Sequence, residues 1–416
     1  MQKEGELRGV IRWSLFALLA AAAFAGGAQA LSAHAGASRQ AATSQVFHVN
    51  VDGHNPRAVE AFIGYYPNVI RVHAGDSVVF HWAGNGEPHT VTLGALVDNV
   101  LNQVAKLTPA QLNGQNPPPA LIAADQKVPQ LFPQGKGDAI QSAANPCFLG
   151  AGGVPGTALC PKTAQPSFDG TQGYYNSGWL DSKANFTVHL SPGTRPGTYN
   201  YMCLLHREGM TGKIVVVPSG QAVPTPWQQI KLGHRQLARQ EQELKPALTA
   251  LRAGKPPFPI AVPGKHVVLA GMASPTAQAG EITEFGPNVI HVPVGGSVIW
   301  YLTGPHTITF NATKANDDIR RTAPDGTVHF NFPALAPAGS PGEPASTPKG
   351  GSQNHPKFKV VAAARWNGEG HLSSGIFANS FGPPLIEGYR LTFTHAGTYR
   401  YICTVHDNMK GTVVVG

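Results

Sequence analysis

Hydrophobic residues recur along the chain in short alternating stretches that are separated by turn-forming residues. Residues 46–51 (Val-Phe-His-Val-Asn-Val) alternate apolar and polar positions, and residues 68–82 hold two more stretches on either side of an Ala-Gly-Asp turn. A period of two residues predicts β-strands. Glycine (48 residues) and proline (36 residues) are frequent, which suits a turn-rich protein. The pattern therefore predicts an all-β fold with long loops.

The same pattern occurs twice. Residues 68–82, followed by Pro-His-Thr at 88–90, match residues 288–302, followed by Pro-His-Thr at 305–307. The Gly-Thr-Tyr-x-Tyr-x-Cys phrase at 197–203 returns at 397–403. Repetition of several phrases in one order predicts an internal duplication of one β-domain. The two copies are predicted to span residues 45–220 and 262–416.

A different periodicity marks residues 221–261, which join the two copies. Leu237, Leu244, Leu248 and Leu251 recur at spacings near seven, four and three, which predicts an amphipathic helix of about five turns. The Gly-Lys-Pro-Pro sequence at 254–257 ends it. We expect this helix to pack between or against the two halves.

Both copies carry long insertions. The first, between His89 and Cys203, starts with a helical pattern at residues 96–112 (Val97, Val100, Leu101, Val104), and the second is rich in proline and glycine around 333–356. Loops of this length are usually functional or disordered. A partner-binding surface and a lineage-specific decoration are equally good interpretations of these insertions.

The N-terminus has the features of a targeting segment. Lys3, Arg8 and Arg12 precede an apolar run at 14–25, and Ala-Gln-Ala at 28–30 is a cleavage signal, so residues 1–30 are predicted to be a signal peptide. An uncleaved membrane anchor is the alternative. Either interpretation predicts a periplasmic or extracellular protein. Residues 31–44 are expected to form a flexible lead.

The charges are spread along the chain. There are 31 Lys and Arg against 23 Asp and Glu, a formal net charge of +8. The absence of any basic block argues against nucleic-acid binding. The positive balance suits an acidic redox partner or peripheral association with an anionic membrane, and it equally suits ordinary solubility.

The chain has four cysteines. Cys147 and Cys160 lie in one Gly/Pro-rich stretch, and in an oxidising compartment they are expected to form a local disulfide. Cys203 and Cys403 instead lie in the repeated phrases, each followed by a histidine and a methionine.

Thiolate, imidazole and thioether together form the ligand set of a blue-copper site. The cysteine and second histidine come from one strand and its turn, and the first histidine comes from a strand far away in sequence. The metal itself drives deprotonation of the thiol. Two type 1 copper ions per chain are therefore expected, with the ligands His89, Cys203, His206 and Met210 at site one and His306, Cys403, His406 and Met409 at site two.

These phrases resemble those of the cupredoxins, of the plastocyanin, pseudoazurin and amicyanin kind. The resemblance covers both copies without their insertions, and it rests on Pro-His-Thr, on Ser-Gly-x-Leu/Phe and on Cys-x-x-His with a downstream Met. It implies two tandem Greek-key β-sandwiches and outer-sphere electron transfer between redox partner proteins, with no catalytic residue. The family often has Asn after the first histidine, where this chain has Thr90 and Thr307. The His-to-Met spacing also differs between the copies, which suggests two different reduction potentials.

Two other functional classes compete with electron transfer. Two-domain copper oxidases and nitrite reductases place a histidine directly before the ligand cysteine, but Met202 and Ile402 stand there in this chain. Copper storage or delivery proteins tend to be rich in methionine, and this chain has five. The identity of the partners and the oligomeric state are left open by the sequence.

Overall fold

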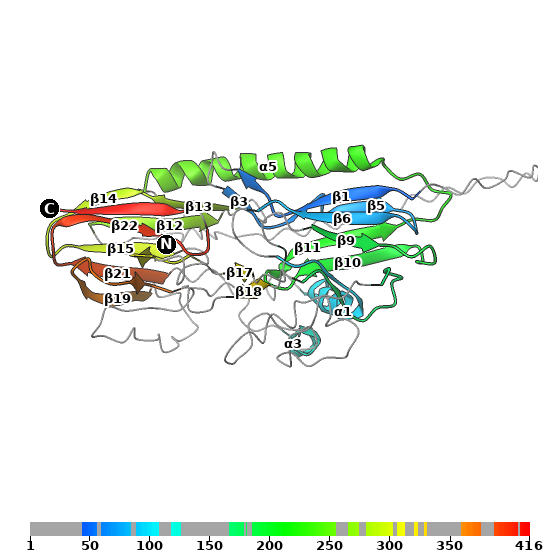
Figure 1. Cartoon of the computed structure of the whole chain (residues 1–416), viewed down its shortest axis with the longest axis horizontal. Coiled ribbons are helices and arrows are strands. Elements are labelled where there is room, and N and C mark those ends of the chain that lie inside the picture. Colours follow the sequence, from blue (N-terminus) through cyan, green and yellow to red (C-terminus); the bar gives the residue numbers. More distant parts are fainter. Residues whose placement is uncertain are drawn as a thin grey trace, which may run out of the picture.

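The computed structural model describes residues 44–55, 60–84, 89–107, 118–125, 166–178, 180, 185–254, 265–273, 280–302, 306–312, 320–322, 328–330, 359–375, 387–406 and 408–416. Its described residues form two β-sandwiches with one long helix lying along both (Figure 1). The predicted all-β fold with two sandwiches and a helical linker is therefore confirmed. The predicted signal peptide and the Cys147–Cys160 disulfide lie outside the described residues.

Two sheets face each other in the first sandwich. One sheet has the order β4 (Tyr65–Tyr66), β1 (Val46–Val51), β6 (Ser77–Trp82), β9 (Asn185–His189). The other has the order β5 (Val69–Val72), β11 (Arg207–Val216), β10 (Gly197–Cys203), β7 (Thr92–Leu93), β8 (Tyr175–Asn176). The period-two pattern of β1 is borne out, because Phe47, Val49 and Val51 are fully buried.

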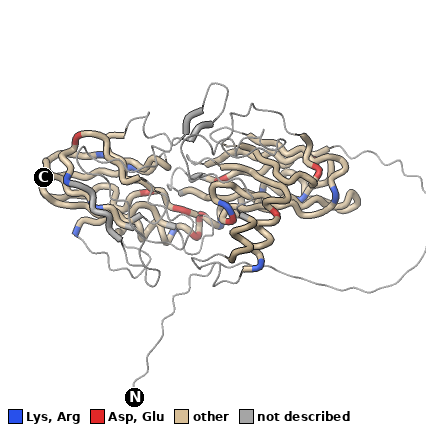
Figure 2. The backbone as a smooth tube through the Cα atoms, turned by 90° about the horizontal axis from the view of Figure 1, so that it is seen from below, with Lys and Arg blue, Asp and Glu red and all other residues tan. Residues whose placement is uncertain are grey.

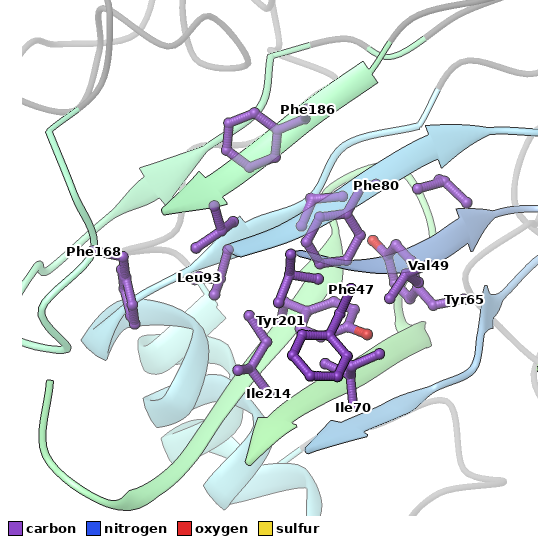
Figure 3. Close-up of a cluster of buried hydrophobic side chains, with 14 of the residues drawn as sticks. Phe47, Val49, Tyr65, Ile70, Phe80, Leu93, Phe168, Phe186, Tyr201 and Ile214 are labelled. Atoms are coloured by element: carbon purple, nitrogen blue, oxygen red, sulfur yellow. The ribbon is translucent and has the colours of Figure 1, made fainter. Parts of the chain in front are cut away.

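The first core fills the space between these sheets. Figure 3 shows aromatic side chains from both sheets, Phe47, Phe80 and Tyr201 among them, pointing toward one another. Tyr65 and Phe80 both meet Tyr201 edge-on, at ring-centroid distances of 4.7 and 5.1 Å. Cys203 belongs to this same buried cluster, so one end of the core is also the wall of site one.

The second sandwich repeats this plan and adds three strands to one of its sheets. One sheet has the order β14 (Val289–Val292), β23 (Lys410–Val415), β22 (Gly397–Ile402), β16 (Thr309–Phe310), β20 (Leu372–Ser373). The other has the order β19 (Lys359–Trp366), β21 (Glu387–Phe393), β15 (Ser297–Leu302), β12 (Val267–Ala273), β13 (Gly280–Gly286), β3 (Glu60–Phe62), β2 (His54–Asn55). A separate ribbon pairs β17 (Arg320–Thr322) with β18 (Val328–Phe330).

One of the added strands is β19, at one edge of this sheet. The other two form the β2–β3 hairpin, which belongs to the first half by sequence but extends a sheet of the second half. Phe62 lies opposite Gly280, Ala61 opposite Glu281, and Glu60 opposite Ile282. Counted back from the shared Pro-Asn-Val-Ile sequence (67–70 and 287–290), Ala61 and Glu281 are equivalent residues of the duplication. Two equivalent strands therefore pair antiparallel about their own equivalent residue, as the two copies of a symmetric dimer do.

The linker helix α5 (Pro226–Arg252) spans both halves. Leu244 and Leu251 are fully buried on it, in a cluster with Phe62 of the first half and Ile282 of the second. The helix exceeds the predicted five turns, because its first turns dock through polar side chains that a leucine pattern does not reveal. The Gln229 side chain accepts a hydrogen bond from the Arg71 N–H (2.8 Å) and donates one to the Arg71 carbonyl (2.6 Å), and so covers edge strand β5.

Two short helices of the first insertion, α1 (Ala95–Val104) and α3 (Pro119–Asp125), pack together. The helical pattern that begins at residue 96 is thereby confirmed. Val97 and Val100 are buried in one cluster with Met202 and Leu204, the two neighbours of Cys203. The insertion therefore covers the back of the strand end that carries this cysteine.

Among the described residues, Lys and Arg are scattered over both halves in the view of Figure 2. Among the residues that the structure describes, no helix has the length and apolar character needed to cross a bilayer.

Candidate metal centres

Site one is assembled from three segments at one end of the first sandwich. His89 precedes β7 and is held by paired backbone hydrogen bonds with Leu180 (3.0 and 2.7 Å). Cys203 ends β10, at a register shift against β11, and His206 lies in the turn that follows. The Nδ1 atom of His89 lies 3.9 Å from the Cys203 Sγ. One donor atom from each of the three residues falls within 4.8 Å of the others, as binding of one metal ion requires.

Site two repeats this arrangement. The Nδ1 atoms of His306 and His406 lie 3.9 and 3.7 Å from the Cys403 Sγ, and they lie 3.2 Å from each other. All three residues are buried and form a second group with metal-binding spacing. Three imidazole Nδ1 atoms across the two sites thus turn toward a cysteine sulfur.

The two methionines lie in the cores beside the cysteines. Met210 belongs to the buried cluster of Cys203, and Met409 to that of Cys403. The Cys403 N–H donates to the Met409 carbonyl (3.0 Å), and the Met409 N–H donates to the His406 carbonyl (3.1 Å). These bonds fold cysteine, histidine and methionine into one tight loop.

Thr90 and Thr307, which follow the first histidines, tie the ligand segments together. The Thr90 N–H lies 3.4 Å from the Cys203 sulfur, and the Thr90 hydroxyl accepts a hydrogen bond from the Leu204 N–H (2.8 Å). Thr307 makes the same two contacts in the second half, with Cys403 (3.5 Å) and Thr404 (2.8 Å). A hydroxyl therefore performs the cross-linking, and N–H groups aimed at the sulfur favour a thiolate.

The serines of the two Ser-Gly sequences, Ser177 and Ser374, form hydrogen bonds with the strands that follow the first histidines. The Ser177 hydroxyl accepts from the Val91 N–H, and the Ser374 hydroxyl accepts from the Ile308 N–H, both at 2.8 Å. Each serine also donates its backbone N–H to the same partner's carbonyl at 3.0 Å.

Two buried carboxylates were not predicted from the sequence. Asp52, at the root of the β2–β3 hairpin, accepts a hydrogen bond from His89 Nε2 at 3.0 Å. Glu281, in β13, has one oxygen 2.6 Å from His306 Nε2 and the other 4.0 Å from His406 Nε2. Each first histidine thus turns Nδ1 toward sulfur and Nε2 toward a carboxylate. No spacing in the sequence marks these residues, since they lie at different positions in the two halves.

The site groups shift one another's pKa strongly in the metal-free protein. Burial alone would lower the pKa of the histidines, but Asp52 and Cys203 raise the pKa of His89 to about 9. Glu281 and Cys403 likewise raise the pKa of His306 to about 10. Burial would raise the thiol pKa, but the neighbouring histidines lower it to about 5 at Cys203 and at Cys403. Each site thus holds its thiolate at neutral pH before metal arrives.

These shifts predict how the stability of the metal-free protein depends on pH. The thiol contribution is full above its ordinary pKa of 9.0 and is lost as pH falls through 5. The imidazole contribution at His89 is full below 6.5 and is lost as pH rises through about 9. At site one these two slopes cancel between pH 6.5 and 9. Between pH 6.5 and 5 the thiol contribution alone changes at each site, so we expect stability to fall from pH 6.5 to 5, by up to ~1.4 kcal/mol per pH unit and site.

Urea unfolding of the metal-free protein at pH 5 and 6.5 measures this dependence. The double variant Cys203→Ser/Cys403→Ser is the control, because it has no thiolate to protonate and should lose the slope. An equal slope in both proteins would contradict the assignment.

The two sites differ in exposure. Cys203 and His89 are fully buried, while His206 is partly exposed at the rim of site one. At site two, His406 is buried together with His306 and Cys403. Among the described residues, His206 therefore leaves site one partly exposed, whereas the three donors of site two are all buried.

No family model and no curated protein sequence matches the chain. Among solved structures, a dithionite-reduced auracyanin from the photosynthetic bacterium Roseiflexus castenholzii aligns at 17% identity over 42% of this chain and 98% of its own, with a TM-score of 0.23. A mutant of amicyanin in its reduced Cu(I) form aligns at 22% identity over 38% and 86%, with a TM-score of 0.19. A pseudoazurin from Sinorhizobium meliloti aligns at 18% identity over 46% and 95%, with a TM-score of 0.17.

Each half has two facing sheets, a cysteine at the end of one strand, a histidine in the following turn and a second histidine from a distant segment. The chain thus has two sandwiches that each hold one His–Cys–His group of metal-binding spacing, and in this arrangement it resembles the cupredoxins.

Proposed function

We propose that the protein is an exported electron-transfer protein with two blue copper sites. The observation that carries the proposal is the pair of His–Cys–His groups in which imidazole Nδ1 atoms face a buried cysteine sulfur. The proposed ligands are His89, Cys203, His206 and Met210 at site one, and His306, Cys403, His406 and Met409 at site two.

The donor set fits copper. Thiolate and thioether are soft ligands, and two imidazoles with one thiolate and a weak thioether are the donors of a blue site. Copper bound there supplies one-electron chemistry. The chain's part is to hold the donors in one arrangement and to exclude water, and the threonine cross-links and the buried cores supply both. A rigid, dry site needs little rearrangement when its charge changes.

The rim of site one is the proposed point of contact with a redox partner. His206 is partly exposed there, and electron tunnelling weakens steeply with distance. The two described helices of the first insertion pack in one cluster with Leu204 and Leu205, the residues directly before His206. An acidic partner protein would complement the net charge of +8.

The catalytic alternative is an oxidase or nitrite reductase. In this chain Met202 and Ile402 precede the two cysteines, so the histidine that would lead to a catalytic copper is missing in both halves. Delivery of copper to another protein is the second alternative, and it requires ready metal loss.

Copper titration of the metal-free protein, with the visible spectrum and the bound copper measured together, tests the proposal. We expect two tightly bound ions and an intense thiolate-to-copper band that rises with both. A third copper with turnover of nitrite or oxygen would make the protein an enzyme, and rapid loss to a chelator would favour delivery. The absence of any blue band would overturn the proposal.

A further inference from the structure

We propose that Asp52 and Glu281 are positioning residues for the metal, each fixing the first imidazole of its site and setting the reduction potential there. The inference rests on the proposed copper function and goes beyond it. It assigns one role to two carboxylates that occupy different positions in the two halves.

Asp52 reaches site one from a bulge at the end of β1. Its backbone has φ +66°, and its N–H donates to the Gly64 carbonyl (2.7 Å). Gly53 and Phe62 exchange two backbone hydrogen bonds directly beyond it (3.1 and 3.0 Å). These backbone hydrogen bonds fix the position of Asp52, so that its carboxylate contacts His89 Nε2. The Asp52 side chain is almost fully buried.

The equivalent bulge in the second half has no side chain. Val51 pairs with Trp82, and Ala270 with Leu302, the matching residue of the repeat, so Asp52 corresponds to Gly271. Gly271 has φ +72°, and a Cβ atom there would lie 1.9 Å from His306 Nε2. The imidazole of site two therefore occupies the space that a side chain at the bulge would need.

Glu281 supplies the missing carboxylate from the neighbouring strand. Its counterpart in the first half is Ala61. The first half therefore has Asp at the bulge and Ala on the strand, and the second half has Gly at the bulge and Glu on the strand. Each first histidine keeps one carboxylate at Nε2. A carboxylate thus reaches Nε2 of the first histidine in both halves, although it comes from a different position in each. We infer that each site needs this carboxylate.

The pairing of the two halves explains why the acid is not at the same position in both. Ala61 and Glu281 lie directly opposite each other in the β3–β13 ladder. Side chains opposite each other lie on one face of a sheet, and like charges there are destabilising. Only one half can therefore hold a glutamate at this position, and the other must take its carboxylate from the bulge.

A carboxylate next to a ligand histidine has known effects on metal binding. A carboxylate at Nε2 fixes the tautomer that leaves Nδ1 free for a metal, orients the ring and makes it a stronger ligand. At a buried oxidised site, the thiolate and the carboxylate together balance the two charges of Cu(II). The carboxylate therefore stabilises the oxidised form, and its loss should raise the reduction potential.

The test compares variants of site two in the full chain with site one silenced by Cys203→Ser. Glu281→Gln keeps the shape and removes the charge, and Glu281→Ala removes both. We expect both to raise the potential, and Glu281→Ala to weaken copper binding about 10- to 100-fold. Glu284→Gln is the matched control, because Glu284 lies on the same strand in an ion pair with Arg252 (2.8 Å).

The variant Gly271→Asp/Glu281→Ala transplants the arrangement of site one into site two. The His306 ring must shift to admit this side chain, because a Cβ atom at residue 271 would lie 1.9 Å from Nε2. With Glu281 removed, we expect the ring to shift and the new carboxylate to meet Nε2 as Asp52 does, so that affinity and potential recover. In the reduced, Cu(I)-loaded protein, ¹⁵N–¹H NMR should show a slowly exchanging Nε2–H on His306, lost in Glu281→Ala and regained in the double variant. Urea unfolding confirms that each variant is folded.

If both Glu281 variants have the same reduction potential and copper affinity as Glu284→Gln, this inference is overturned, while the proposed copper function is unaffected. A wild-type protein without copper binding would overturn both.

Discussion

The variant Cys203→Ser is expected to bind one copper ion tightly and to show about half of the blue absorption, because a thiolate is the donor that makes a blue site. Site two should remain intact, since Cys403 belongs to a separate buried cluster in the other sandwich. Cys403→Ser should give the complementary result. The absorption spectrum and copper content of each variant, measured after removal of loosely bound metal, check the prediction.

The two variants are each other's control, because each leaves one complete site in an otherwise unchanged chain. Their difference spectra should sum to the wild-type spectrum, and the double variant should be colourless. Loss of the whole band in either single variant would contradict two independent sites. It would indicate instead that both cysteines bind one metal centre.

The sequence allowed prediction of the features that depend on local order. Cys203 and His206 are three residues apart in one turn, so their phrase alone predicts that they meet. The first histidine could be paired with them because the whole unit is repeated, with Pro-His-Thr in the same place in both copies. The structure brings His89 and His306 to these groups.

Other features could not be predicted because they depend on tertiary contacts that leave no repeating pattern in the sequence. Asp52 and Glu281 reach the histidines from different strands, and a repeat that places them at non-equivalent positions hides their common role. The β2–β3 hairpin pairs with the other half, although nothing in its few residues distinguishes it from an ordinary hairpin. The length of α5 was underestimated because glutamine rather than leucine docks its first turns.

The contacts between the halves make the two sites parts of one structure. Strand β13 contains Glu281, whose side chain contacts His306. The backbone of the same strand pairs with β3 of the first half. The hairpin that contains β3 begins directly after Asp52, which holds His89. A change in the pairing of the halves therefore acts next to both sites, and the residue at the centre of this pairing should be the most sensitive.

That residue is Ala61, and the variant Ala61→Glu is expected to destabilise the folded protein by roughly 3 kcal/mol at pH 7, because it buries a second, unpaired carboxylate opposite Glu281. Both positions are almost fully buried, with exposed fractions of 1% and 6%. Burial and the like charge both raise the pKa of an introduced carboxyl above its unfolded value. The loss relative to wild type should therefore shrink as pH falls toward about 5.

Urea unfolding of the metal-free proteins at pH 7 and pH 5 measures both effects. Ala61→Gln has the same size without the charge, so its smaller loss gives the cost of fitting a longer side chain, on the order of 1 kcal/mol. Adding Glu281→Gln to Ala61→Glu should recover much of the difference, because it removes the repulsion across the ladder. Equal losses for Ala61→Glu and Ala61→Gln, with no dependence on pH, would show that charge does not limit this position. The asymmetric placement of the two acids would then need another physical cause.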